Sequence, residues 1–248
     1  MPTTIYKPES QGGLNTDKRV LVTGGNKGIG LETSRYFLVR GYEVIVLARN
    51  FGGFPLQGEK NITTCEFDLT RIETIPALVQ DLGSIDVLVN NAGVMFSLPF
   101  DAYPQDKMEA LMRLNIEAPV ALMREVGKQM AARGEGRIVN NASVAGQVGH
   151  PDIWYGISKA GLINATKSFA RILGPEGVLV NAVAPSPVET DMLEVIPQHR
   201  RETFKESVIN KRFATAAEVA EAIGWLGTTS PAYINGICID INNGAFPR

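Results

Sequence analysis

Two tyrosine–lysine pairs in this 248-residue chain have a spacing that suits proton transfer. Tyr155 and Lys159 lie in "WYGISKAG", and Tyr103 and Lys107 lie in "AYPQDKME". A tyrosine hydroxyl has a reference pKa near ~10, and a nearby ammonium group lowers that pKa. Residues four apart share one face of a helix, so each lysine can act on its tyrosine. Such a pair can supply the proton that a ketone oxygen needs when a hydride is added to the carbonyl carbon.

The residues around the two pairs favour a catalytic role for the first pair, Tyr155 and Lys159. Ser143 lies twelve residues before Tyr155, at the end of an expected strand, where its hydroxyl can stabilise charge on a carbonyl oxygen. Tyr103 has no such serine, and Pro104 directly after it predicts that the second pair straddles the start of a helix. Asp106 is then a simple salt-bridge partner for the second lysine. We predict that the first pair carries chemistry and that the second is surface structure.

Short apolar runs alternate with helical patterns along the chain, and these elements must position the candidate groups. The runs are typical of strands buried on both faces. Expected strands cover about 19–24, 43–48, 61–69, 85–93, 136–143, 177–185 and 237–241. Expected helices cover about 29–41, 71–83, 107–133, 152–173 and 216–227, with Pro76 disfavouring a regular second helix. The order predicts an α/β fold, a single-domain, Rossmann-like, doubly wound parallel sheet of about seven strands with helices on both faces.

Composition and the chain's first residues narrow the class of protein. Residues 1–18 show no periodicity and are expected to be a flexible tail before a single Rossmann-fold domain, 19–248. The net charge of −2 predicts no general attraction to nucleic acid. No apolar run approaches the ~20 residues of a membrane helix. Cys65 and Cys238 are expected to be free thiols, which suits the cytoplasm, and two isolated histidines argue against a histidine-rich metal site.

The turn "TGGNKGIG" (23–30) follows the first expected strand and opens the first expected helix. Glycines at such a turn let backbone amides approach a pyrophosphate, which the helix N-terminus also favours electrostatically. The turn therefore predicts dinucleotide binding. Its spacing, T-G-x-x-x-G-x-G with Gly24, Gly28 and Gly30, differs from the common G-x-G-x-x-G.

The end of the second expected strand indicates which dinucleotide is bound. Enzymes that use NAD usually carry an acid there for the ribose diol, whereas this chain has "VLARN" with Arg49 and Asn50. A guanidinium group pairs well with a 2′-phosphate, and Lys27 in the glycine turn is placed to help. We predict NADP(H) as the cofactor in preference to NAD(H).

Taken together, the glycine spacing, "NNAG" at 90–93, Ser143 and the Tyr155–Lys159 pair resemble the short-chain dehydrogenase/reductase family over about residues 19–246. The resemblance implies that Ser143, Tyr155 and Lys159 are catalytic and that Asn115 holds a proton-relay water. It also implies that the lysine binds the nicotinamide ribose.

The same resemblance implies how the cofactor is bound. "NNAG" shapes the adenosine side of the site, Asp68 contacts the adenine amino group, and "PSPVET" (185–190) contacts the nicotinamide carboxamide. Ser186 replaces a family glycine in that segment, which puts the local geometry in question. The full set of predicted cofactor contacts is Gly24, Asn26, Lys27, Gly28, Ile29, Gly30, Arg49, Asn50, Asp68, Leu69, Asn90, Ala92, Gly93, Tyr155, Lys159, Pro185, Val188 and Thr190.

The substrate is expected to be a small molecule with a carbonyl group, and two kinds remain open: the 3-oxoacyl thioester of a housekeeping reductase, or the ketone or acyl thioester of a specialised reductase. The motifs most resemble 3-oxoacyl-[acyl-carrier-protein] reductases, and the basic segment 199–212 suits an anionic acyl thioester. Against the carrier protein, Glu176 stands where those reductases often carry a basic docking residue. Other functional hypotheses are an NAD-dependent secondary alcohol dehydrogenase and an NADP-binding sensor without turnover.

A homotetramer is also expected. Family members commonly pair the helices near 107–133 and 152–173 across subunits, with a second contact at "GICIDI" (236–241). The apolar residues that suggest such a contact are Met108, Leu111, Met112, Leu122, Met123, Leu162 and Phe169.

Overall fold

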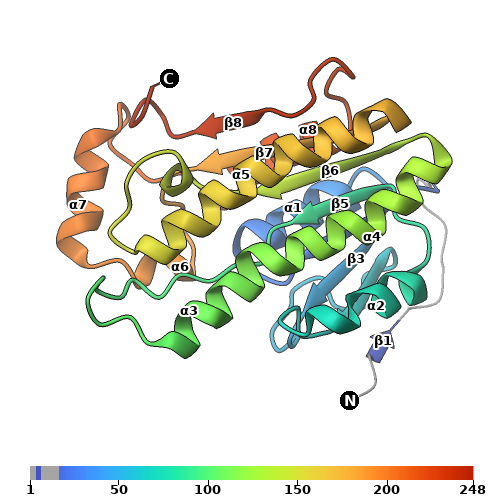
Figure 1. Cartoon of the computed structure of the whole chain (residues 1–248), viewed down its shortest axis with the longest axis horizontal. Coiled ribbons are helices and arrows are strands. Elements are labelled where there is room, and N and C mark those ends of the chain that lie inside the picture. Colours follow the sequence, from blue (N-terminus) through green and yellow to red (C-terminus); the bar gives the residue numbers. More distant parts are fainter. Residues whose placement is uncertain (1–3, 7–16, 248) are drawn as a thin grey trace.

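One sheet, with eight strands among the described residues, runs through the protein (Figure 1). The structure, a computed structural model, describes residues 4–6 and 17–247. The sheet order is β1-β4-β3-β2-β5-β6-β7-β8, and β2 to β8 are parallel. All seven expected strands are present, and the doubly wound α/β fold is confirmed. The strands are β1 Thr4–Tyr6, β2 Arg19–Thr23, β3 Glu43–Ala48, β4 Ile62–Glu66, β5 Val87–Asn90, β6 Gly136–Asn141, β7 Val178–Pro185 and β8 Cys238–Ile241.

Strand β1 is not predicted by the sequence. It lies within the segment 1–18 that the sequence assigns to a flexible tail, and it pairs antiparallel with β4 at the edge of the sheet. An edge strand of three residues is joined by main-chain hydrogen bonds, so it needs no apolar pattern that a sequence would reveal. The other residues of 1–16 lie outside the described ones.

Helices cover both faces of the sheet (Figure 1). On one face α2, α4 and α5 enclose a core cluster that includes Leu88, Leu122 and Ile138. On the other face α1 and α8 enclose a second cluster around Val22, Phe37 and Ile223. The α-helices are α1 Gly28–Leu38, α2 Ile75–Leu82, α3 Gln105–Met112, α4 Ala118–Arg133, α5 Ile153–Leu173, α6 Asp191–Glu194, α7 Gln198–Ser207 and α8 Ala216–Gly227.

The helix expected at 107–133 is divided into α3, a π-helical turn at Arg113–Glu117, and α4. In a regular α-helix the N–H of residue 119 would donate to the carbonyl of Asn115, but Pro119 has no N–H. The missing donor gives a physical reason for the wider turn, and such turns are frequent at functional sites. Pro76, by contrast, lies in the first turn of α2, where a proline is tolerated.

The strand order locates the site before any side chain is considered. The chain leaves β2 towards β3 on one side, and β5 lies on the other side of β2. Ligands of doubly wound sheets bind outside the carboxyl ends of the strands where the order reverses in this way. Here that point is the crevice beyond the ends of β2 and β5. Across the part of the chain that the structure describes, no helix has the length and apolar character needed to cross a membrane.

Candidate active site

The glycine turn between β2 and α1 has a backbone that only glycine fits well. Gly24 and Gly28 have φ values of 62° and 52°, in the left-handed region. A Cβ atom on Gly30 would lie 2.0 Å from the Gly24 carbonyl oxygen, so no side chain fits there. The turn thus folds tightly on itself, and its glycines add no side-chain atoms of their own.

The N-terminus of α1 has the free donors that a pyrophosphate requires. Lys27 occupies the N-cap position and makes no side-chain hydrogen bond to the helix. The first amides of a helix have no intrahelical acceptor, and together with the helix dipole they attract an anion. A dinucleotide pyrophosphate therefore fits the residues present.

Two residues that the sequence analysis did not select brace this turn. The Thr23 hydroxyl accepts the N–H groups of Asn91 and Ala92 at 2.9 and 3.0 Å. The Asn91 side chain donates to the carbonyls of Thr23 and Gly24 at 3.0 and 3.2 Å. Asn91 lies in "NNAG", so the motif contained the signal, although the neighbouring Asn90 was selected.

Three other predicted cofactor contacts have side chains engaged elsewhere. Asn90 is buried within the sheet and donates to Asn140 at 2.8 Å. Leu69 belongs to the hydrophobic core. The Asp68 carboxylate accepts the N–H and hydroxyl of Thr70 at 3.0 and 2.8 Å. Asp68 is exposed at the carboxyl edge of the sheet, so its second oxygen is accessible.

The two candidate phosphate-binding cations differ in their surroundings. Arg49 is exposed just after β3 and makes no ion pair with any described residue. Lys27 is also exposed, but its Nζ lies 2.8 Å from the Asp191 carboxylate. Asn50 lies beside the glycine turn, because the Asn26 side chain donates to its carbonyl at 3.0 Å. The positive charge of Lys27 is thus partly neutralised, whereas that of Arg49 is not.

Ser143 and Tyr155 meet at the carboxyl edge of the sheet. Ser143 follows β6, and its hydroxyl accepts the Ala145 N–H at 3.1 Å. Tyr155 lies in the first turn of α5 and is only 8% exposed. Burial raises the pKa of Tyr155 to about 12, while the nearby Ser143 hydroxyl opposes this shift. The tyrosine–lysine spacing predicts a lowered pKa for Tyr155, but in the protein alone desolvation of the phenol outweighs the other effects.

Lys159 lies one turn beyond Tyr155, as the spacing predicts. Its Nζ is 5.6 Å from the centre of the tyrosine ring and donates to the Asn141 carbonyl at 2.8 Å. The side chain is buried, and desolvation lowers the pKa of Lys159 to about 8. The Asn141 side chain in turn donates to Asn91 at 2.9 Å, so a continuous polar chain joins the lysine to the braced glycine turn.

Asn115 lies in the π-helical turn and holds the chain just after β5. Its Oδ1 accepts the Val94 N–H, and its Nδ2 donates to the Val94 carbonyl, both at 2.9 Å. It also donates to the Ser158 hydroxyl on α5 at 3.1 Å. A Cβ atom on Gly93 would lie 3.3 Å from Asn115 Oδ1 and 3.6 Å from Lys159 Nζ. The asparagine therefore lies beside the lysine, as a relay would require.

The segment after β7 closes the other side of the site. Pro185 ends β7, Val188 is buried, and the Thr190 methyl group would lie 3.2 Å from a Cβ atom on Gly28. Ser186, which replaces the family glycine, is 8% exposed, and its N–H donates to the Ile241 carbonyl at 3.0 Å. The larger side chain is accommodated within the fold.

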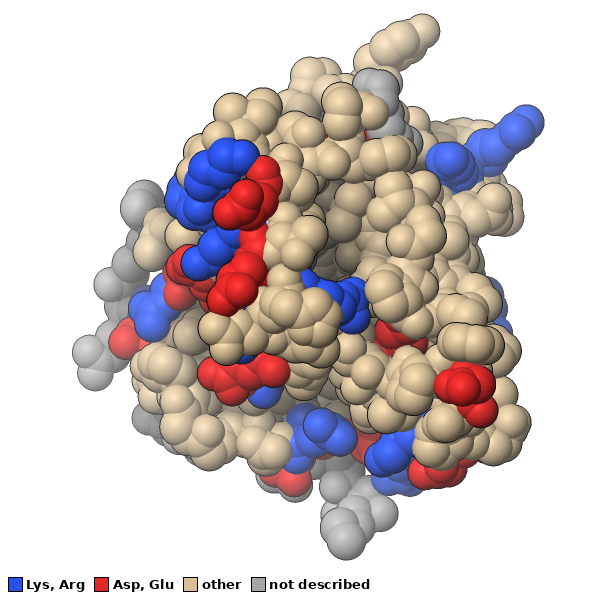
Figure 2. All heavy atoms as spheres, turned by 90° about the vertical axis from the view of Figure 1, so that its left-hand side faces the viewer, with Lys and Arg blue, Asp and Glu red and all other residues tan. Residues whose placement is uncertain are grey.

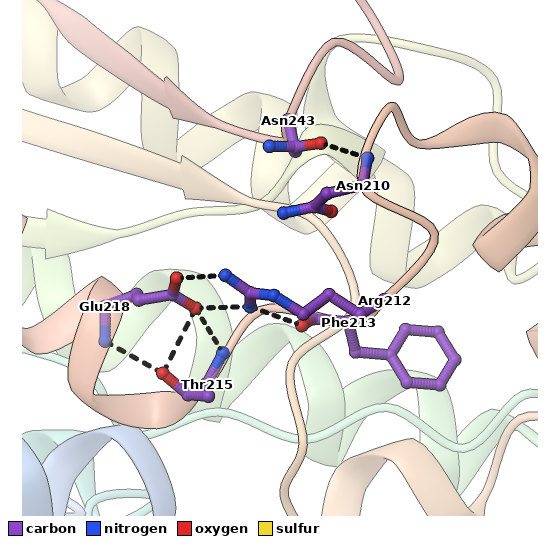
Figure 3. A network of polar contacts seen from close by, with 6 residues as sticks. All are labelled: Asn210, Arg212, Phe213, Thr215, Glu218 and Asn243. Carbon is purple, nitrogen blue, oxygen red and sulfur yellow. Dashed lines mark hydrogen bonds and ion pairs between the residues drawn. The ribbon is translucent and has the colours of Figure 1, made fainter.

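Helices α6 and α7 follow this segment, and their far end is anchored by a polar network (Figure 3). Arg212 donates to Glu218 and to the Phe213 carbonyl, and Glu218 also accepts the Thr215 N–H at 2.8 Å. The Arg212 guanidinium holds the pKa of Glu218 near about 2. Asn210 donates its N–H to the Asn243 side chain. Figure 2 views this end of the molecule, where charged groups of both signs surround a hollow.

The second tyrosine–lysine pair corrects the sequence analysis in part. α3 begins at Gln105 after Pro104, so the pair does straddle a helix start. Lys107 is exposed, but its Nζ lies 5.2 Å from the centre of the Phe96 ring, and no Asp106 ion pair appears among the described residues. The Tyr103 hydroxyl is buried, and Tyr103 packs in the same hydrophobic cluster as Tyr155. The prediction of surface structure is therefore wrong for Tyr103.

A glycine turn that fits a pyrophosphate lies at the reversal point of a doubly wound sheet, beside a serine, a tyrosine and a lysine, and this arrangement is typical of dinucleotide-dependent oxidoreductases. Residues 18–201 match the short chain dehydrogenase family model, and the chain belongs to that family. It is 32% identical to the 3-oxoacyl-[acyl-carrier-protein] reductase of Vibrio harveyi over 237 residues, 92% of this chain and 97% of that protein. It is 31% identical to nodulation protein G of Rhizobium meliloti over 242 residues, 92% and 97% of the two chains.

Solved structures agree with this assignment. ElxO, solved with NADP bound, superposes with a TM-score of 0.84 at 29% identity, over 92% of this chain and 98% of that chain. A gluconate 5-dehydrogenase of Burkholderia cenocepacia, solved with NADP and tartrate, has a TM-score of 0.86 at 26% identity, over 94% and 96%.

Proposed function

We propose that this chain is an NADP(H)-dependent reductase that converts a ketone to a secondary alcohol. The observation that carries the proposal is the buried set of Ser143, Tyr155 and Lys159 beside the glycine turn. A sensor without turnover needs no such set next to its cofactor. NADPH, when bound, supplies the hydride for the carbonyl carbon.

The residues of the set have separate roles in the proposal. Tyr155 donates its hydroxyl proton to the carbonyl oxygen, and its raised pKa keeps the phenol protonated near neutrality. Ser143 donates a hydrogen bond to the same oxygen and stabilises charge as it develops. Lys159 supplies a positive charge beside the phenol and holds the ribose hydroxyls. Asn115, next to the lysine, holds a water that returns protons from solvent.

The cofactor preference rests on Arg49. An exposed guanidinium without an ion-pair partner among the described residues suits a 2′-phosphate, whereas an acid at this place would repel it. The relatives solved with NADP support the same choice. The other cofactor contacts that we propose come from the glycine turn, Asn50, Asp68, the "NNAG" segment and Thr190.

A 3-oxoacyl thioester is the substrate class that we favour, because relatives named as 3-oxoacyl-[acyl-carrier-protein] reductases match nearly the whole chain. The test is a panel of 3-oxoacyl thioesters and simple ketones, each assayed with NADPH and with NADH. We expect NADPH to be consumed faster with the thioesters than with the simple ketones. Consumption of NADH alone, or no consumption with any carbonyl compound, would contradict the proposed function.

We also propose that the protein is a homotetramer, although some of the residues expected at its subunit contacts must be replaced by others. Leu111, Leu122, Met123 and Leu162 are at most 2% exposed in the single chain, so they belong to its core and not to a subunit contact. The exposed apolar side chains near the expected contacts are Ile153, Ile157 and Ile172 on α5, and Tyr233 and Ile237 before β8.

Light scattering at micromolar concentration is expected to give the mass of four chains. Ile157→Asp should lower that mass, because it puts a charge into an apolar contact. Val39→Asp should not, since Val39 is exposed after α1, away from both contacts. A wild-type protein that stays monomeric would remove the proposal.

Finally, we propose that the protein acts in the cytoplasm. Cys65 is a buried free thiol in the structure, which suits a reducing compartment.

A further inference from the structure

Asp152 is a buried carboxylate between the catalytic helix and the segment that follows β5. It is 1% exposed and lies at the N-cap of α5. Its Oδ1 accepts the Tyr155 N–H at 3.1 Å, and its Oδ2 accepts the Ser97 N–H at 2.8 Å. One side chain thus joins Tyr155 to the segment 94–103. A buried carboxylate is costly unless it is well hydrogen-bonded, so both contacts are strongly held.

The segment that Asp152 holds packs against the Tyr155 side chain. Met95, Leu111 and Tyr155 are buried together, and Tyr103 packs against them. Burial, followed by the charge and hydrogen bonding of the neighbouring Asp152 carboxylate, raises the pKa of the Tyr103 hydroxyl, so this hydroxyl lies beside the carboxylate. If the hydrogen bond from Ser97 to Asp152 were lost, the segment 94–103 would be free to move away from the Tyr155 ring.

We propose that Asp152 is a positioning residue, which clamps the segment 94–103 against Tyr155 and places a negative charge near the proton donor. This inference rests on the proposed function, in which Tyr155 is the proton donor. It assigns a role to a carboxylate that touches neither substrate nor cofactor.

The polar and charged groups around Tyr155 shift its pKa in opposite directions. Lys159 approaches the ring from the same helix, and the His150 ring lies 5.4 Å from it, centre to centre. Arg200 on α7 acts on His150, and Tyr103 faces the ring from the clamped segment. After burial, the Asp152 charge raises the pKa of Tyr155, in the opposite sense to the Ser143 hydroxyl. Removing the charge must therefore lower the pKa of the proton donor.

Two substitutions separate the clamp from the helix cap. Asp152→Asn removes the charge and, with Oδ1 still on the Tyr155 N–H, turns an N–H₂ group towards the Ser97 N–H. Asp152→Ser keeps a good N-cap but is too short to reach Ser97. Asp106→Asn is the matched control, because it removes an exposed carboxylate from the first turn of α3. All three are compared with wild type after their folding is checked by thermal unfolding.

Two measurements test the proposal. Amide hydrogen exchange of the full chain is expected to rise in segment 94–103 for both Asp152 variants and to stay unchanged for Asp106→Asn. Reduction by NADPH is expected to slow about tenfold or more, since small displacements of a reacting group cost large factors. The rate of reduction should also begin to fall at a lower pH in both Asp152 variants than in wild type. Without the Asp152 charge, the Tyr155 hydroxyl loses its proton more easily.

The outcomes are distinguishable from a failure of the proposed function. Hydrogen exchange needs no substrate, so unchanged exchange in both Asp152 variants would overturn the clamp even if no ketone is reduced. A slower rate with an unmoved pH profile would overturn the role of the charge. If Asp152→Ser behaves as wild type, the carboxylate is only a helix cap and the inference is wrong.

Discussion

Tyr155→Phe is expected to slow hydride transfer to the ketone about 10²- to 10⁴-fold, while NADPH still binds. The substitution removes the hydroxyl and keeps the ring, which is buried against Met95 and Leu111. The alkoxide formed on the substrate then has no positioned proton donor, because Ser143 can only donate a hydrogen bond to it. The measurement is single-turnover reduction with saturating NADPH, together with cofactor binding followed by fluorescence.

Two lysine variants provide the comparison for this result. Lys159→Ala is expected to reduce both the rate and the affinity for the cofactor, because one ammonium group serves the phenol and the ribose. Lys107→Ala has the same four-residue relation to a tyrosine, but its side chain is exposed over Phe96, so both quantities should stay near wild type. Near-normal turnover in Tyr155→Phe would show that another group donates the proton.

Tyr103 is not a suitable inert control, although its spacing to Lys107 first suggested one. Pro104 and the absence of a serine twelve residues upstream, which indicate surface structure, are both local features. The burial of Tyr103 depends on how the segment 94–103 folds back onto α5, and the hydrogen bond from Ser97 to Asp152 that holds this segment joins residues 55 apart in the chain. Local spacing cannot reveal a contact of this kind, because it arises only when the strands have brought the two segments together.

The sheet, by contrast, could be predicted strand by strand. Strands β2, β3, β5 and β7 are mainly apolar, as burial on both faces requires, whereas β4, β6 and β8 also contain polar residues. The alternation of strands with helices predicts that the strands are parallel. The carboxyl ends of these strands then carry the candidate residues to one edge. What the strands do not determine is which of two neighbouring asparagines faces the site. Asn90 and Asn91 lie on opposite faces of the chain, and only the second braces the glycine turn.

The π-helical turn around Asn115 shows a similar limit. Periodicity predicted one long helix, and α3 and α4 do continue each other on either side of the turn. The single residue that explains the interruption is Pro119, which removes one donor without ending the helix. The resemblance to known dehydrogenases identified Asn115, but its contacts with Val94 and Ser158 depend on the geometry of the widened turn.

Arg49→Ala is expected to weaken binding of NADPH about ten- to a hundredfold and to leave NADH nearly unchanged. A hydrogen bond to a charged phosphate contributes about 1.5–3 kcal/mol, and NADH has no 2′-phosphate to lose. Lys27→Ala should discriminate less, because Asp191 lies 2.8 Å from the Lys27 ammonium and already offsets its charge.

Arg40→Ala is the matched control for this experiment. It removes the same charge from an exposed position between α1 and β3, at the amino edge of the sheet and so opposite to the site. Dissociation constants for both cofactors, measured by calorimetry at several salt concentrations, should show the phosphate contribution falling as salt rises. If Arg49→Ala weakens both cofactors equally, the arginine does not bind the 2′-phosphate, and the preference for NADP(H) has lost its structural basis.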